Sequence, residues 1–105
     1  MSEVKIKEKK PFDKTDGKEK TEGWEFIVEV KEDDKALEYK VTLDKSYWKS
    51  LSAEKGKPED LVRRSFEFLL ERESKESILS QFDLRIIQKY FPTYEAKIKI
   101  AKEPQ

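Results

Sequence analysis

Apolar side chains recur at every second position along two neighbouring stretches of the chain, 24–30 and 37–43. A period of two is typical of strands that bury one face. The charged stretch 32–35 between them is typical of a turn. We therefore expect an antiparallel hairpin, and because an isolated hairpin is unstable, helices must cover its apolar face. The alternating apolar residues are Trp24, Phe26, Val28, Val30, Leu37, Tyr39, Val41 and Leu43.

Four later segments carry their apolar residues at helical spacing. Asp44, Ser74 and Asp83 precede three of these segments as N-caps, and Pro58 suits the first residue of the other. Pro92 stops the last segment, because proline cannot continue a helix. The spacing predicts short helices at 45–53, 58–72, 75–81 and 84–91.

The predicted helix 58–72 is apolar around an arc of roughly 200°. Ser65 lies in this arc, where its hydroxyl can bond back to a carbonyl of the preceding turn. Arg72, at the end of the helix, can bond the terminal carbonyls. A surface helix needs a narrower apolar stripe, so we expect this helix to be covered on two sides, by the sheet and by other helices or a second subunit.

The two ends of the chain leave alternatives open. Residues 1–23 read as a flexible N-terminal arm or as an edge strand, with ordered structure beginning at residue 24, and residues 101–105 as a disordered tail. Residues 94–100 alternate again, which fits a last strand or a helical continuation. The predicted fold class is α+β: one domain, 24–100, in which an antiparallel β-hairpin, extended to three or four strands if the terminal segments join it, packs against three to four short helices.

Charge and composition narrow the class of protein. Lys+Arg and Asp+Glu both total 23, and this zero net charge disfavours binding to a polyanion through bulk charge. The N-terminus has no apolar signal core, and purely apolar runs do not exceed three residues. We therefore expect a soluble, cytoplasmic protein that does not bind a membrane.

The chain lacks the residue types on which most catalytic and cofactor-binding sites depend. The chain has no cysteine and no histidine, which removes thiolate nucleophiles, zinc–cysteine sites, catalytic triads and the usual general base near neutral pH. Its three glycines are isolated, so no phosphate-binding loop is visible. The turn Glu32-Asp33-Asp34 lacks the spacing of a calcium loop and reads as solvated surface rather than a weak cation site. We predict no catalytic, cofactor-binding or metal-binding residues and no cofactor.

A basic and aromatic stretch, 45–64, is the best candidate for a contact surface. Cations contact phosphates and aromatic rings stack on bases, so this stretch could bind nucleic acid or a protein partner. The alternative is that its aromatic residues belong to the core and its basic residues to a solvated face, which zero net charge favours. The candidate contact residues are Lys45, Trp48, Lys49, Arg63 and Arg64.

The stretch 90–94, Tyr-Phe-Pro-Thr-Tyr, is rich in aromatic residues. It can line a ligand pocket, or it can form a structural corner that closes the helical layer, with partners for any buried tyrosine hydroxyl. We favour the structural corner.

Four short runs in the C-terminal half of the chain form a pattern that recurs in other proteins. The runs SFEFLLERE at 65–73, KESIL at 75–79, FDL at 82–84 and YFPTYE at 90–95 resemble the C-terminal half of short, uncharacterised bacterial proteins of about this length. The resemblance implies a bacterial origin and a stable fold, and it transfers no functional residues.

Three functions are open at this point. The favoured one is a non-enzymatic protein-interaction module that forms a homodimer or binds a protein partner through its helical layer, because helix 58–72 has more apolar surface than a small monomer needs. The alternative is a nucleic-acid-associated or regulatory protein that uses the stretch 45–64. The third, an enzyme built on carboxylates alone, would need a cleft that holds two or more acids.

Overall fold

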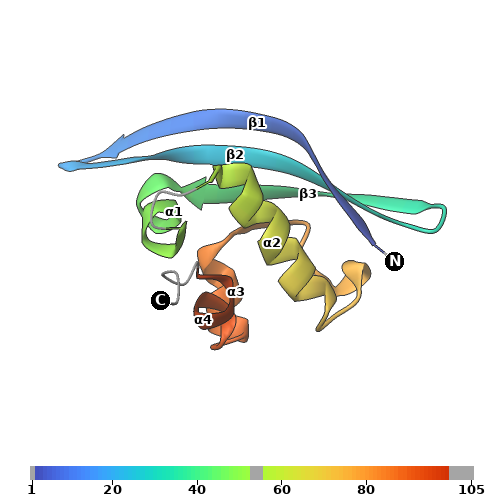
Figure 1. The fold of residues 1–105 in the computed structure, drawn as a ribbon. Coiled ribbons are helices and arrows are strands. Elements are labelled where there is room, and N and C mark those ends of the chain that lie inside the picture. The colour runs from blue at the N-terminus through green and yellow to red at the C-terminus, as the bar shows by residue number, and fades with distance from the viewer. Residues whose placement is uncertain (1, 53–55, 100–105) are drawn as a thin grey trace.

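The chain forms one sheet with helices packed on one of its faces (Figure 1). A computed structural model describes residues 2–52 and 56–99. Its elements are four strands, four short α-helices and one 3₁₀ turn, so the fold is α+β, as the apolar pattern predicted.

The sheet is mostly antiparallel. Its order follows the chain, and each strand pairs with the next. The first three strands pair antiparallel, whereas the fourth lies parallel to the third. The strands are β1 (Glu3–Asp16), β2 (Glu19–Glu32), β3 (Lys35–Asp44) and β4 (Gln81–Asp83).

The predicted hairpin is β2 and β3, joined at the turn where Asp33 takes a positive φ of 57°. Ordered structure does not begin at Trp24 as expected, because β2 starts at Glu19 and the N-terminal segment is the edge strand β1. Val4 and Ile6 pair with the buried valines of β2, and beyond a bulge the rest of β1 is largely charged. Beyond the bulge, main-chain hydrogen bonds to β2 continue the strand although this part has no apolar face. A pattern of side chains does not indicate pairing of this kind.

Close approach of strands explains Gly23. A Cβ at this position would lie 2.1 Å from the carbonyl oxygen of Leu43. Gly23 faces the last residue of β3, after which the chain turns directly into a helix. Any side chain here would push the two strands apart at this corner.

Several helices differ from the predicted ones in their bounds or in their type. The second predicted helix is two residues shorter, and residue 53 of the first lies outside the described part of the chain. The predicted helix 75–81 is wrong: a short 3₁₀ turn is followed by β4. Of the two alternatives left open for 94–100, a last strand or a helical continuation, the described part follows the helical one up to residue 98. The elements are α1 (Lys45–Ser52), α2 (Pro58–Leu70), η1 (Lys75–Ser77), α3 (Arg85–Tyr90) and α4 (Tyr94–Ile98).

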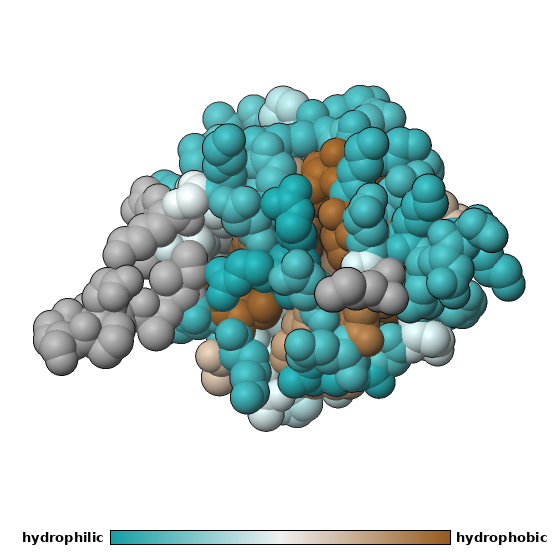
Figure 2. All heavy atoms as spheres, turned by 45° about the vertical axis from the view of Figure 1, so that its right-hand side comes forward, coloured by the Kyte–Doolittle hydropathy of each residue, from teal (hydrophilic) through white to brown (hydrophobic). Residues whose placement is uncertain are grey.

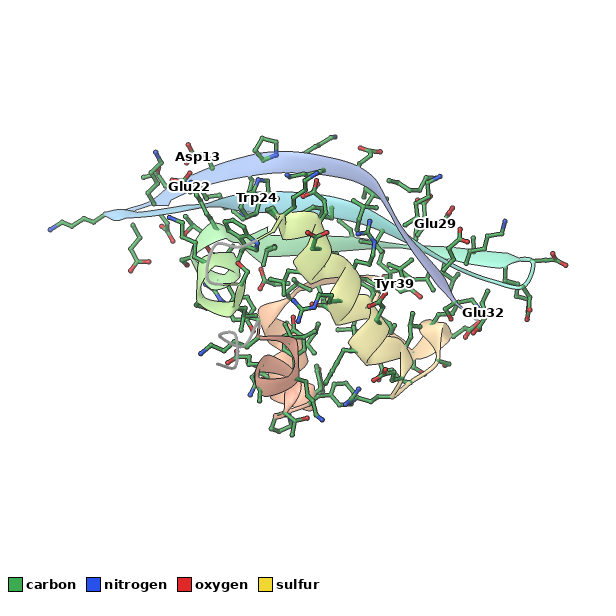
Figure 3. The ribbon with its side chains drawn as sticks, viewed as in Figure 1. Asp13, Glu22, Trp24, Glu29, Glu32 and Tyr39 are labelled. Atoms are coloured by element: carbon green, nitrogen blue, oxygen red, sulfur yellow. The ribbon has the colours of Figure 1, made fainter. Side chains whose placement is uncertain are left out.

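Helix α2 lies at the centre of the core and is covered on two sides by the same chain. Phe66 is fully buried, with its ring 5.2 Å from that of Tyr39 on β3; Tyr39 points from the sheet toward the helices, whereas Glu29 lies on the other face (Figure 3). On its second side, Phe68 packs edge-on against Tyr94 of α4, with ring centres 5.3 Å apart. The sheet and helix α4 of the same chain therefore cover the wide apolar arc of α2 on two sides.

Candidate functional site

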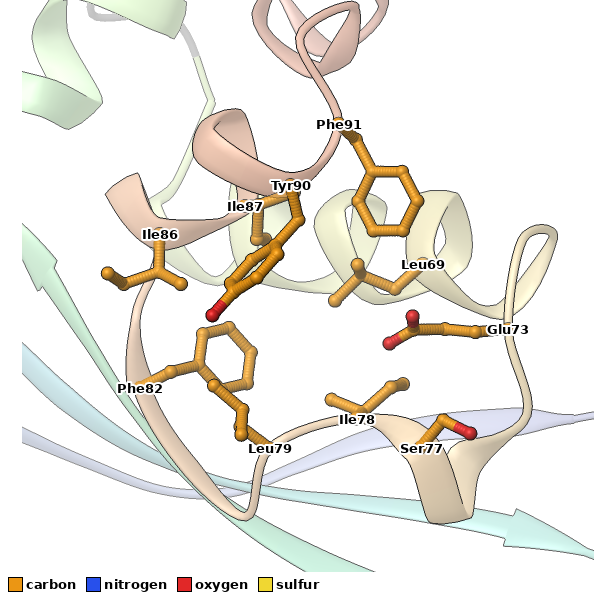
Figure 4. A pocket seen from close by; sticks show the side chains of 10 residues that line it. All are labelled: Leu69, Glu73, Ser77, Ile78, Leu79, Phe82, Ile86, Ile87, Tyr90 and Phe91. Carbon is orange, nitrogen blue, oxygen red and sulfur yellow. The ribbon is translucent and has the colours of Figure 1, made fainter.

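A groove of about 380 Å³ opens between the end of α2, the turn around Ser77, strand β4 and helix α3 (Figure 4). Aliphatic and aromatic side chains make up most of its lining. The lining residues are Leu69, Glu73, Ser77, Ile78, Leu79, Phe82, Ile86, Ile87, Tyr90 and Phe91.

The groove has a buried floor and exposed walls. Ile78, Phe82 and Ile87 are at most 8% exposed, because they also belong to the core under β3 and α2. Leu79 is 53% exposed and Tyr90 is 68% exposed. The groove is thus an extension of the core that reaches the surface between two exposed apolar side chains.

Outside this groove, few large apolar side chains are exposed among the described residues. Figure 2 shows one face of the molecule, on which hydrophilic side chains predominate and apolar ones emerge in narrow areas between them. Among the described residues, the large apolar side chains classed as exposed are Leu37, Leu79 and Tyr90. Two of these three line the same groove, which makes it the strongest candidate site.

Glu73 is the charged residue of the groove, and its carboxylate points into it (Figure 4). Its side chain is half-buried, and within the described ranges no cation lies at ion-pair distance from it. The acids on either side of it have partners: Glu71 pairs with Arg72, and Glu76 pairs with Lys75. Glu73 therefore places an uncompensated negative charge at the edge of an apolar surface.

The turn that carries Glu73 is anchored to the sheet through Lys75. This side chain is 5% exposed and reaches Glu32 at 3.2 Å and Glu76 at 3.3 Å. Burial acts to lower the pKa of Lys75, but the two carboxylates outweigh it and raise that pKa. The pKa of Glu32 is lowered by a hydrogen bond from Ser2 and by Lys75, so this residue of the acidic turn is paired.

The opposite wall, α3, is fixed by two carboxylates of the sheet. Asp44 accepts a hydrogen bond from the Arg85 guanidinium at 2.6 Å. Asp83 accepts one from the Arg85 main-chain N–H at 2.9 Å and another from the Thr42 hydroxyl at 2.7 Å. Both walls of the groove are therefore held in place by side chains outside it, as a preformed binding surface requires.

The end of α2 is closed as its sequence suggested. Arg72 donates to the main-chain oxygen of Phe68 at 2.9 Å and stacks over the same ring at 3.6 Å, which confirms its predicted role at the helix end. Ser65 bonds back to the Leu61 carbonyl at 2.7 Å, also as predicted. These contacts leave the Arg72 charge committed to the helix end.

The aromatic stretch 90–94 divides between core and groove. Tyr94 is fully buried, and Phe91 packs against Phe68, so these two residues form the expected structural corner. Phe91 also lines the groove, and so does Tyr90, which is 68% exposed.

The five basic and aromatic candidates do not form one surface. Lys45 and Lys49 of α1 line a hollow that also contains Asp44. Arg63 lines a different hollow, between β1 and α2, and pairs with Asp60 at 3.6 Å. In both hollows the basic side chains lie among acids.

The other candidates of this stretch are occupied within the chain. Arg64 donates to the Ile98 carbonyl, and Lys45 lies 3.9 Å from Glu22. Trp48 packs edge-on against Trp24, with ring centres 5.6 Å apart, and its buried Nε1 has no hydrogen-bond partner within 2–52 and 56–99. Trp48 is partly buried against the core, whereas a stacking platform for bases presents an open ring face.

Two classes of site find no support in the described residues. No group of three or more acidic side chains in ranges 2–52 and 56–99 could hold a metal ion. Over the same ranges, no helix is long and apolar enough to cross a membrane.

Comparisons with protein-family models, with curated proteins and with solved structures found no match to this chain. The sequence indicated a ligand pocket only as the less favoured alternative for 90–94, whose Tyr90 lines the groove. It gave no sign that Leu79 is exposed, because Leu79 has the apolar spacing of the predicted helix 75–81. Glu73 gave no signal either, since it lies in a run of alternating charges. Function must be inferred from the groove itself.

Proposed function

We propose that this chain is a protein-interaction module that binds a segment of a partner protein in the groove between α2, β4 and α3. The observation that carries the proposal is the pair Leu79 and Tyr90: of the three large apolar side chains exposed among the described residues, these two stand on one concave, mainly apolar surface. Apolar and aromatic side chains that protrude beside a pocket are typical of protein contacts.

A protein segment suits this groove better than a small molecule. Small ligands usually have 70–90% or more of their surface buried, in pockets of about 300–1,000 Å³. The groove is at the small end of that range, and its two prominent wall residues are more than half exposed. Such walls can cover one or two side chains of a segment whose remainder stays outside.

Self-association is one form of the same proposal. Helix α2, which suggested a homodimer from the sequence, is covered within one chain, so by this proposal a second copy uses the groove instead. By this proposal the protein acts in a bacterial cytoplasm. The absence of cysteine fits this compartment, because cytosolic proteins rarely rely on disulfides for stability.

The test is a selection of displayed random peptides on the full-length protein, followed by affinity measurement for the selected peptides. Leu79→Ser and Tyr90→Ser alter the groove, and Leu37→Ser is the matched control, since Leu37 is also exposed but lies outside the groove. We expect each groove variant to weaken binding about tenfold or more and the control to leave it unchanged. Circular dichroism verifies that each variant is folded.

Two results would overturn the proposal. One is a selection that yields no peptide and a protein that remains monomeric in sedimentation velocity at high concentration. The other is a set of peptides that bind wild type, both groove variants and the Leu37 variant equally well.

A further inference from the structure

We infer that the partner segment carries a lysine or arginine beside the apolar side chain that enters the groove, and that Glu73 selects it. This inference rests on the proposed function and adds the chemistry of the partner. It starts from the carboxylate of Glu73, which points into the groove and has no cation at ion-pair distance among the described residues.

Docking changes the surroundings of this carboxylate. In the free protein, water reaches the half-buried side chain and solvates its charge. An apolar side chain seated on Ile78 and Leu69 would displace part of that water. Burying an ionised carboxylate is costly unless a charge partner or hydrogen bonds replace the water, so an apolar segment without a cation binds at a penalty.

Both cations of the turn that carries Glu73, a turn lying wholly within the described residues, are committed elsewhere. The turn from Glu71 to Glu76 holds three acids and two bases. Arg72 is bound at the end of α2, and Lys75 is buried between Glu32 and Glu76. The cation that compensates Glu73 must therefore come from the partner.

The same charge discriminates between partners. A lysine or arginine of the segment gains an ion pair at the edge of an apolar contact, whereas an aspartate or glutamate at that place meets a like charge. Glu73 therefore sets specificity, while Leu79 and Tyr90 supply the apolar contact.

The experiment repeats the peptide selection on four forms of the full-length chain: wild type, Glu73→Gln, Glu73→Lys and Glu67→Lys. Glu67 is exposed on α2 outside the groove, so its variant makes the same change in net charge without touching the site. We expect wild type and Glu67→Lys to enrich lysine or arginine next to an apolar anchor. Glu73→Gln should lose this preference, and Glu73→Lys should enrich aspartate or glutamate instead.

Affinities of one wild-type peptide complete the test. Binding should weaken about tenfold in Glu73→Gln and remain within about twofold in Glu67→Lys, and added salt should weaken wild type more than Glu73→Gln.

The outcomes separate this inference from the proposed function. If peptides depend on Leu79 and Tyr90 but show the same charge preference on wild type, Glu73→Gln and Glu73→Lys, the inference is wrong and the interaction module stands. If no peptide depends on the groove, both fall. Because Glu73→Gln is nearly isosteric with wild type, it gives the answer even if the charge reversal disturbs folding.

Discussion

A buried pair of hydroxyls joins α2 to α4 and makes a quantitative prediction. The oxygens of Ser65 and Tyr94 lie 2.6 Å apart, and both side chains are fully buried. Ser65 gives its one hydroxyl hydrogen to the Leu61 carbonyl, so the Tyr94 hydroxyl must donate to Ser65. Tyr94 therefore depends on Ser65 for an acceptor, whereas the donor of Ser65 is satisfied without Tyr94.

This inequality sets the expected costs. Tyr94→Phe removes one neutral hydrogen bond and should lower the free energy of unfolding by about 1 kcal/mol. Ser65→Ala leaves the Tyr94 hydroxyl buried without an acceptor, which costs about 1–3 kcal/mol, offset by about 0.5 kcal/mol from the better helix propensity of alanine. The double variant leaves no buried donor unpaired and should cost less than the sum of the two single changes.

Urea unfolding followed by circular dichroism measures all four proteins at equilibrium. The slope of free energy against urea should stay constant, so that shifts of the midpoint report stability alone. We expect a coupling energy of at least about 0.5 kcal/mol between Ser65 and Tyr94. Additivity within about 0.3 kcal/mol would refute the reasoning, because it would mean that the two hydroxyls do not interact.

Three further predictions concern stability. Phe66→Ala should cost about 3–5 kcal/mol in urea unfolding, and a loss below about 1 kcal/mol would contradict its burial. Gly23→Ala should cost about 1–3 kcal/mol, seen as a lower Tm, because its Cβ meets the Leu43 carbonyl; an unchanged Tm would exclude that contact. Burial, with the charge of Glu76, raises the pKa of Tyr39 to about 12. Because the folded-state pKa is raised, its contribution to stability is fully present below the unfolded-state pKa near 10 and is lost as the pH rises from 10 to 12. Tm should therefore fall over this range, and a flat Tm would contradict the prediction.

The sequence by itself determined the elements whose pattern is long and regular. Alternation from 24 to 43 fixed the hairpin of β2 and β3, because a period of two admits one buried face. The wide apolar arc of α2 required cover on two sides, which its core position confirms. The local hydrogen bonds of Ser65 and Arg72 followed from their places in the helix.

Short segments were ambiguous, and their tertiary surroundings decided between strand and helix. Tyr94 and Ile98 lie four residues apart, a spacing that puts them on one side of a strand and equally on one side of a helix. In the folded chain both are buried in α4, whereas Ala96 between them, which a strand would have buried, is exposed. Similarly, Phe82 is buried by pairing with β3, a contact with a residue 41 positions earlier that no local pattern specifies.

The exposure and the charge balance of the candidate site depended on tertiary structure. Leu79 and Tyr90 have the same apolar character as their buried neighbours, and the chain exposes them only because β4 and α3 present other residues to the core. Glu73 looks like any acid in a charged turn until the fold commits Arg72 and Lys75 to other partners. A side chain's type is written in the sequence, but its exposure and its charge balance are properties of what the folded chain places around it.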